Sequence, residues 1–209
     1  MTSFIDTENK IIGSLLQSPL ESNSIHQIAQ KTGLSYVTVH TIVPKLFREN
    51  IIKIEKKGKA HLVSINLEYD FIEKIASALI YQRIIFLKKY PSFVLFLRDV
   101  EEILADKFYC LLLFGSYATG SQKENSDIDL LFIVPYESNI EDYKKKISSA
   151  LKLHPVPRKE YSIVSTKTFL EMLNQKYTVG REILTHSLVL FGAEYYYSMV
   201  KSYVRTKGY

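Results

Sequence analysis

The sequence predicts an α+β chain built in two parts, a helical segment that ends in a hairpin and a longer segment in which strands and helices alternate. In the first part, apolar residues recur at the spacing of an amphipathic helix. Two strand-like runs, 51–55 and 60–66, lie on either side of the tip Lys56-Lys57-Gly58-Lys59. In the second part, short apolar runs such as 110–114 and 130–134 have the length of buried strands, and helical patterns separate them.

The amino-acid composition indicates which classes of protein this chain can belong to. The chain has 209 residues, of which 46% are hydrophobic and 23% charged, as in an ordinary globular protein. No secretion signal is evident, and the longest apolar runs are too short to span a bilayer, so we expect a cytoplasmic protein without membrane contact. A single cysteine, Cys110, excludes an intrachain disulfide. The net charge of +5 is compatible with an anionic partner but does not require one.

Three helices are expected before the hairpin, at 5–16, 25–32 and 36–49. Each is preceded by a side chain able to accept hydrogen bonds from the free N–H groups of a helix start, namely Asp6 or Thr7, Ser24 and Ser35. Gly33 suits the left-handed residue that ends the second helix. Pro44 lies inside the third helix, so we expect that helix to kink or restart there.

The second part begins with a helical pattern over 71–90, which we expect to link the two parts and hold them apart. Pro91 breaks this helix, and Ser92 is placed to cap another that runs to about residue 106. The remaining elements are expected as strands at 108–114, 127–134 and 160–164, helices at 140–151 and within 166–187, an apolar run at 188–191 and a Tyr-rich helix from Ala193. The predicted domains are therefore 1–68, a linker helix at 69–90, and 91–209.

The stretch that carries chemistry is Gly115-Ser116 followed, after ten residues, by Asp127-Ile128-Asp129. A Gly-Ser pair between a strand and a helical turn lets backbone N–H groups and a hydroxyl face phosphates. Asp127 and Asp129 are two residues apart on a predicted strand, so their carboxylates share one face while Ile128 points into the core. This arrangement suits two Mg²⁺ ions, which would activate an acceptor hydroxyl and stabilise a departing pyrophosphate.

This motif resembles the signature of the DNA polymerase β-like nucleotidyltransferases. Its spacing is most similar to that of the minimal nucleotidyltransferases, many of which act as antitoxins beside a helical toxin. The resemblance covers roughly residues 92–200 and implies a small mixed sheet with flanking helices, a nucleoside triphosphate (NTP) substrate and two Mg²⁺ or Mn²⁺ ions. It also implies the site residues: Asp127 and Asp129 as catalytic metal ligands, Glu160 as a third catalytic carboxylate, and Gly115, Ser116 and Ser126 in nucleotide binding. Two positions depart from the family, since Thr119 stands where many relatives have Arg and Glu160 where Asp is usual.

The segment 24–40 resembles the helix-turn-helix of winged-helix regulators. That resemblance implies that Tyr36, Thr38 and His40 face the major groove of double-stranded DNA while Val37, Val39 and Leu46 pack inward or along the flank. The lysines of the hairpin tip, Lys56, Lys57 and Lys59, would meet phosphates. The alternative is that this segment serves for homodimerisation or partner contact.

Three functions remain open on the sequence alone. The chain is an enzyme that moves a nucleoside monophosphate from an NTP to an acceptor hydroxyl, which includes protein hydroxyls. Alternatively, it is a transcriptional regulator whose second part binds nucleotide or a partner without catalysis. A third function combines both, as an antitoxin that modifies a helical toxin-like protein and represses its own operon.

Overall fold

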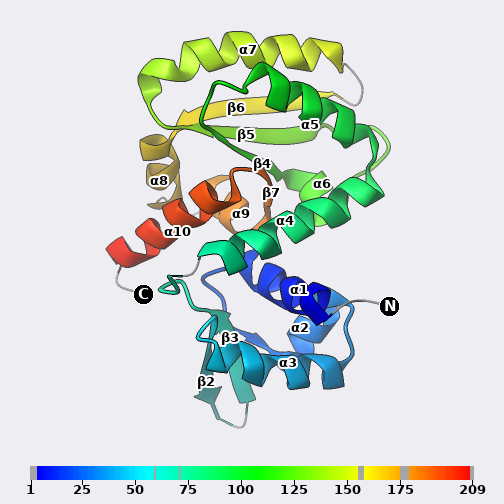
Figure 1. Ribbon diagram of the computed structural model, residues 1–209, viewed down its shortest axis with the longest axis vertical. Helices are drawn as coiled ribbons and strands as arrows, with labels where there is room; N and C mark the ends of the chain where they lie inside the picture. The colour runs from blue at the N-terminus through cyan, green and yellow to red at the C-terminus, as the bar shows by residue number, and fades with distance from the viewer. Residues whose placement is uncertain (1–3, 59, 71, 155–157, 175–178, 208–209) are drawn as a thin grey trace.

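The computed structural model describes residues 4–58, 60–70, 72–154, 158–174 and 179–207 (Figure 1). The N-terminal elements form one end of an elongated molecule, and a four-stranded sheet with its flanking helices forms the other. Between them lies the long helix α4, so the two ends meet along one helix.

The N-terminal end consists of three helices and a small antiparallel sheet. Its elements are α1 (Phe4–Leu16), β1 (Asn23–Ser24), α2 (Ile25–Thr32), α3 (Tyr36–Arg48), β2 (Ile52–Lys57) and β3 (Ala60–Ile65). The strands are ordered β1-β3-β2, with β2 and β3 forming the expected hairpin. The predicted helices and strands are thus confirmed within a few residues.

Local hydrogen bonds explain where α2 and α3 start and stop. The Ser24 hydroxyl accepts from the Gln27 N–H at 3.2 Å, and the Gln27 side chain accepts from the Ser24 N–H in return. The Ser35 hydroxyl accepts from the Thr38 N–H at 3.0 Å. Gly33 closes α2 with a φ of 67°, a conformation that glycine adopts without steric cost. The expected roles of Ser24, Gly33 and Ser35 are confirmed.

Two expectations for this end were wrong. Asp6 and Thr7 do not cap α1, because the helix is already formed at Phe4 and both residues lie inside it. The helix also does not restart at Pro44, since α3 runs from Tyr36 to Arg48 without interruption. Val43 and Leu46, on either side of the proline, are both buried, so core packing outweighs the lost hydrogen bond.

The second part carries a four-stranded mixed sheet and the helices around it. Its elements are α4 (Ile72–Lys89), α5 (Ser92–Ile103), β4 (Cys110–Phe114), α6 (Gly115–Thr119), β5 (Ile128–Val134), the 3₁₀ turn η1 (Glu137–Asn139), α7 (Ile140–Leu153), β6 (Lys159–Ser165), α8 (Thr166–Asn174), α9 (Val179–His186), β7 (Leu188–Phe191) and α10 (Ala193–Lys207). The strand order is β6-β5-β4-β7, in which only the β5–β6 pair is parallel. The predicted α+β class with a small mixed sheet is confirmed.

Three boundaries differ from expectation. Ser92 is the first residue of α5 and does not cap it, because Pro91 occupies the position before the helix and no side chain caps that end. The helix also stops at Ile103, short of residue 106. Strand β5 begins at Ile128, so Asp127 lies one residue before the strand and not within it.

Alternation along the strands divides the core in two. Leu111, Leu113, Leu130 and Phe132 face α5 and α7, which cover one side of the sheet (Figure 1). Cys110, Leu112, Leu131 and Ile133 face the other side and belong to a second cluster that includes residues of α8, α9 and α10.

This second cluster continues into the N-terminal end. It includes Ile11, Ile12 and Leu15 of α1 together with Ile75 and Leu79 of α4. Helix α4 contacts α1 on one side and β7 and α10 on the other. The expected helix is present, but it joins the two ends through a common core and does not hold them apart.

Candidate active site

The site is built first by the turn that follows β4. Gly115 has a φ of 69°, which lets the chain leave the strand and enter α6 at once. Phe114 pairs with Asp129 across the antiparallel β4–β5 ladder, so Gly115 reaches the Asp129 side chain. A Cβ atom on Gly115 would lie 2.2 Å from Oδ2 of Asp129. A larger residue at position 115 would require this carboxylate to move.

The parallel β5–β6 ladder brings a second carboxylate alongside. Asp129 pairs directly with Glu160, the residue that the family resemblance implied as a third carboxylate. The Arg158 guanidinium donates to Glu160 Oε1 at 3.1 Å, and both side chains are largely exposed. Glu160 is therefore oriented by a cation while remaining open to solvent and to a ligand.

Negative charge accumulates around Asp129. Burial raises the pKa of its carboxyl, and the nearby carboxylates of Glu160, Asp127 and Glu182 raise that pKa further. Within the described ranges, neither Asp127 nor Asp129 makes a side-chain hydrogen bond or ion pair. Among the described residues, Arg158 pairs with Glu160, whereas Asp127 and Asp129 have no cationic partner.

Glu182 was not predicted from the sequence. It lies in the first turn of α9, which packs near α6 and β4. A Cβ on Gly180 would lie 2.5 Å from the Met172 carbonyl oxygen, so this glycine allows α9 to pack closely on α8. The sequence offers only one indication of Glu182, the glycine two residues before it. Such a pair is too common in sequences to identify a functional site.

The carboxylates fit a divalent cation that is completed by its substrate. The described residues contain no group of three or more Cys, His, Asp or Glu side chains arranged to hold a metal ion. Mg²⁺, however, is usually bound through one or two carboxylates together with phosphate oxygens and water. Asp127 and Asp129 beside the glycine turn are the carboxylates available for such a set.

The other polar residues near the turn have defined local roles. The Thr119 hydroxyl donates to the carbonyl oxygens of Gly115 and Ser116, each at 3.2 Å, and so closes α6. The Ser126 hydroxyl accepts from the Lys123 N–H at 2.8 Å and closes the turn before Asp127. Ser116 follows Gly115 at the start of α6, where backbone N–H groups have no partner within the helix.

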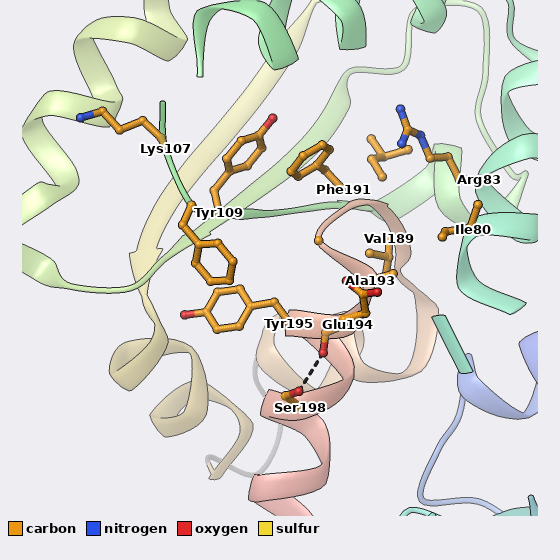
Figure 2. A pocket seen from close by; sticks show the side chains of 13 residues that line it. Ile80, Arg83, Lys107, Tyr109, Val189, Phe191, Ala193, Glu194, Tyr195 and Ser198 are labelled. Carbon is orange, nitrogen blue, oxygen red and sulfur yellow. Dashed lines mark hydrogen bonds between the residues drawn. The ribbon is translucent and has the colours of Figure 1, made fainter. Parts of the chain in front are cut away.

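A large cavity lies at the opposite end of β4 (Figure 2). Its volume is about 520 Å³, and its walls come from α4, β7 and α10 as well as from the residues before β4. Tyr109 and Phe191 stack in it with ring centroids 4.6 Å apart. Because Tyr109 precedes β4 and Gly115 follows it, this cavity is separate from the carboxylates.

The candidate DNA-contacting residues lie elsewhere, on α3 and β2. Tyr36 is 53% exposed and stacks on His40 with centroids 5.8 Å apart. The Thr38 hydroxyl bonds to that of Ser35 at 2.7 Å, within the helix cap. Val39 and Leu46 are buried as expected, but Val37 is 72% exposed, so its expected inward packing was wrong.

The structure describes two of the three hairpin lysines. Lys56 and Lys57 are exposed at the end of β2, where they pair with His61 and Ala60. Lys59 lies outside the described residues. Two of the three lysines that were predicted to meet phosphates are therefore exposed on the hairpin.

The second part is similar to a known family of domains. Residues 97–181 match the family described as nucleotidyltransferase domain. This range contains Gly115, Ser116, Asp127, Asp129 and Glu160. The matched segment therefore includes the turn after β4 and the predicted carboxylates beside it.

Individual relatives align with only part of the chain. A protein of Methanocaldococcus jannaschii, named as a candidate protein adenylyltransferase, is 40% identical over 55 residues. That alignment covers 26% of this chain and 56% of the relative, so the chain spans about half the relative's length. A solved toxin–antitoxin structure with AMP-PNP aligns over 53% of this chain and 89% of its own, at 19% identity and a TM-score of 0.33. At that TM-score the likeness carries no argument.

None of the helices formed by the described residues combines the length and the apolar character that a bilayer span requires.

Proposed function

We propose that this protein transfers a nucleoside monophosphate from an NTP to an acceptor hydroxyl. The contact between Gly115 and Asp129, with Glu160 on the adjacent strand, carries the proposal. In it, Asp127 and Asp129 hold the divalent cations, Mg²⁺ or Mn²⁺, and the backbone of Gly115 and Ser116 binds the triphosphate. Ser126 keeps the turn before Asp127 in place, which positions that carboxylate beside the nucleotide.

The reaction balances as a displacement at the α-phosphorus. The acceptor oxygen bonds to that phosphorus, the bond to the bridging oxygen breaks, and pyrophosphate leaves with the electron pair. Glu160 accepts the proton of the acceptor hydroxyl and passes it to solvent, which its exposed position allows. Divalent cations bound at the site would neutralise the phosphate charge and make the acceptor hydroxyl more acidic.

We further propose a protein hydroxyl as the acceptor. The support is the Methanocaldococcus jannaschii relative, whose name specifies a protein as the substrate of adenylyl transfer. The Glu160 side chain is 55% exposed, so it is accessible to a hydroxyl group on another protein.

For residues 1–68 we propose a winged helix-turn-helix that binds double-stranded DNA through α3. The observation that favours it is the exposed Tyr36–His40 stack, since aromatic rings on a solvent-facing helix are unexplained by packing. If DNA is not bound, the same face serves a partner protein, including a helical toxin, or a second copy of the chain.

The proposed activity is tested with α-labelled NTPs, Mg²⁺ and a cell lysate as the source of acceptors. Asp127→Asn is expected to reduce label transfer at least about 100-fold because a metal ligand is lost. Glu160→Gln is expected to lower it by roughly 10²–10⁴ while nucleotide binding is retained. The control is Glu141→Gln, an exposed carboxylate on α7 whose removal leaves transfer unchanged. Wild-type transfer by Asp127→Asn contradicts the proposal.

A further inference from the structure

A basic trough runs along α4 on the side that faces both the N-terminal helices and α6. It begins as a cavity of about 520 Å³ lined by α1, α2, α4 and α6. A second cavity of about 400 Å³ continues it, because both are lined by Tyr90 and Tyr117. In Figure 1, α4 lies between α1 and α6, which form the two sides of the first cavity. We call the two cavities together the Lys–Tyr trough, defined by Lys10, Lys31, Tyr81, Lys89, Tyr90 and Tyr117.

The charge of the trough is uncompensated. Lys10, Lys31 and Lys89 line the first cavity, and none of its lining residues is acidic. Among the described residues these lysines form no ion pair; the Lys31 ammonium donates only to the Asn23 side chain, at 2.8 Å. Lys123 and Glu124 line the second cavity and offset one another. The first cavity is therefore a positive surface of concave shape, which attracts a polyanion.

Aromatic rings alternate with these lysines. Tyr90 and Tyr117 meet edge to face with centroids 5.7 Å apart, and the Lys89 ammonium lies 5.1 Å from the centre of the Tyr90 ring. Tyr81 adds a third tyrosine farther along α4. Tyrosines provide ring faces on which flat bases stack, while lysines neutralise the phosphates between them.

We propose that the Lys–Tyr trough binds single-stranded nucleic acid. A mononucleotide would occupy one cavity, whereas the trough joins two and places cations on α1, α2 and α4. A duplex keeps its bases stacked inside, out of reach of the tyrosine rings. The site lies beside α6 but includes neither Ser116 nor a carboxylate of the active site, so the proposal does not depend on nucleotidyl transfer.

The test is fluorescence anisotropy with a labelled 12-nucleotide single strand, as RNA and as DNA. The variant Lys10→Gln/Lys31→Gln/Lys89→Gln is expected to bind at least about tenfold more weakly at 0.1 M salt. The slope of log affinity against log salt should also fall by up to about 2, since single strands lose about 0.7 per phosphate contact. The matched control is Lys144→Gln/Lys145→Gln/Lys152→Gln on α7, at the far end of the molecule, which should bind like wild type.

Additional variants and competition experiments distinguish single-strand binding from its alternatives. Tyr117→Leu retains every lysine and is expected to weaken binding at least about fivefold through lost stacking. Equal melting temperatures of the variants and the wild type confirm that they are folded. Unchanged binding in the trough triple variant, or equal loss in the α7 triple variant, overturns the proposal. Stronger competition by unlabelled duplex or by ATP than by unlabelled single strand overturns it as well.

Discussion

Gly115 and Asp129 constrain one another through direct contact. Oδ2 of Asp129 lies where a Cβ on Gly115 would be, and the positive φ of Gly115 turns the chain into α6. A side chain at position 115 would therefore require the Asp129 carboxylate to move.

This contact can be tested with Gly115→Ala. The added methyl group must displace the Asp129 carboxylate, so we expect nucleotidyl transfer to fall at least about 100-fold. The left-handed backbone also strains an alanine by about 1–2 kcal/mol. Gly58→Ala is the control, since Gly58 has a φ of 63° and no atom within 4 Å of a Cβ. It should show the destabilisation without the loss of activity; similar activities of the two variants would contradict the assigned contact.

The charge around Asp129 has a predictable effect on stability. Its pKa is raised above the ordinary value of 3.8, so the folded state binds the proton more tightly than the unfolded state does. The free energy of unfolding therefore falls as pH rises from about that value through the raised pKa. Asp129→Asn removes this dependence and is expected to melt at a higher temperature than the wild type at pH 7, with a smaller difference near pH 4.

Mg²⁺ offers the complementary measurement. A cation that binds only the folded state raises the melting temperature. At pH 7 we expect Mg²⁺ to stabilise the wild type in thermal scans and to leave Asp129→Asn unchanged. An equal response of both proteins would remove Asp129 from the metal-binding set.

Helices and strands were predictable where a local signal agreed with packing. Ser24 and Ser35 mark helix starts because their hydroxyls satisfy free N–H groups nearby in sequence. The predicted restart of α3 at Pro44 was wrong because the burial of Val43 and Leu46 outweighs the hydrogen bond lost at the proline. No local sequence pattern reveals this burial. The prediction that Asp6 caps α1 was wrong because an acidic residue is also favourable within the first turn of a helix.

The hairpin carries a prediction of its own. If residues 1–68 bind double-stranded DNA, Lys56→Gln/Lys57→Gln should reduce the salt dependence of duplex affinity by up to about one phosphate contact per lysine. Anisotropy titration of a duplex from the promoter region of the protein's own gene measures this. The triple variant of the Lys–Tyr trough is the control and should retain duplex affinity. Absence of duplex binding at low salt would leave α3 as a protein-contact surface.

The positions of residues that are distant in sequence but close in the fold were only partly predictable. Glu160 was proposed only through the family resemblance, because no local pattern reveals the parallel pairing that brings it beside Asp129. Glu182 was missed because the position of α9 depends on packing against α8, and sequence spacing carries no record of it. The role of α4 was misjudged for the same reason, since its two partners are separated by most of the chain.

The common core predicts how the protein unfolds. Leu79 of α4 is 4% exposed and belongs to the cluster that joins α1 to α10. Leu79→Ala is expected to cost about 2–5 kcal/mol. Because the cluster spans both ends, calorimetry should record one transition that shifts as a whole to lower temperature. Two separate transitions, of which only one moves, would show that the ends unfold independently.

The bonds between α10 and the segment before α4 have a consequence for how such a chain diversifies. The Tyr197 hydroxyl and the Lys201 ammonium both donate to the Tyr69 carbonyl oxygen, at 3.2 and 3.0 Å, so the junction at residue 69 is tied to the last helix. Residues of α1 share a core cluster with α4 and α10, so a module that replaced the first 68 residues would need a helix with the apolar stripe of α1. Inheritance as a unit is then favoured over domain shuffling. New recognition would arise by point substitution on the exposed face of α3, at positions such as Tyr36, Val37 and His40, which the core does not constrain.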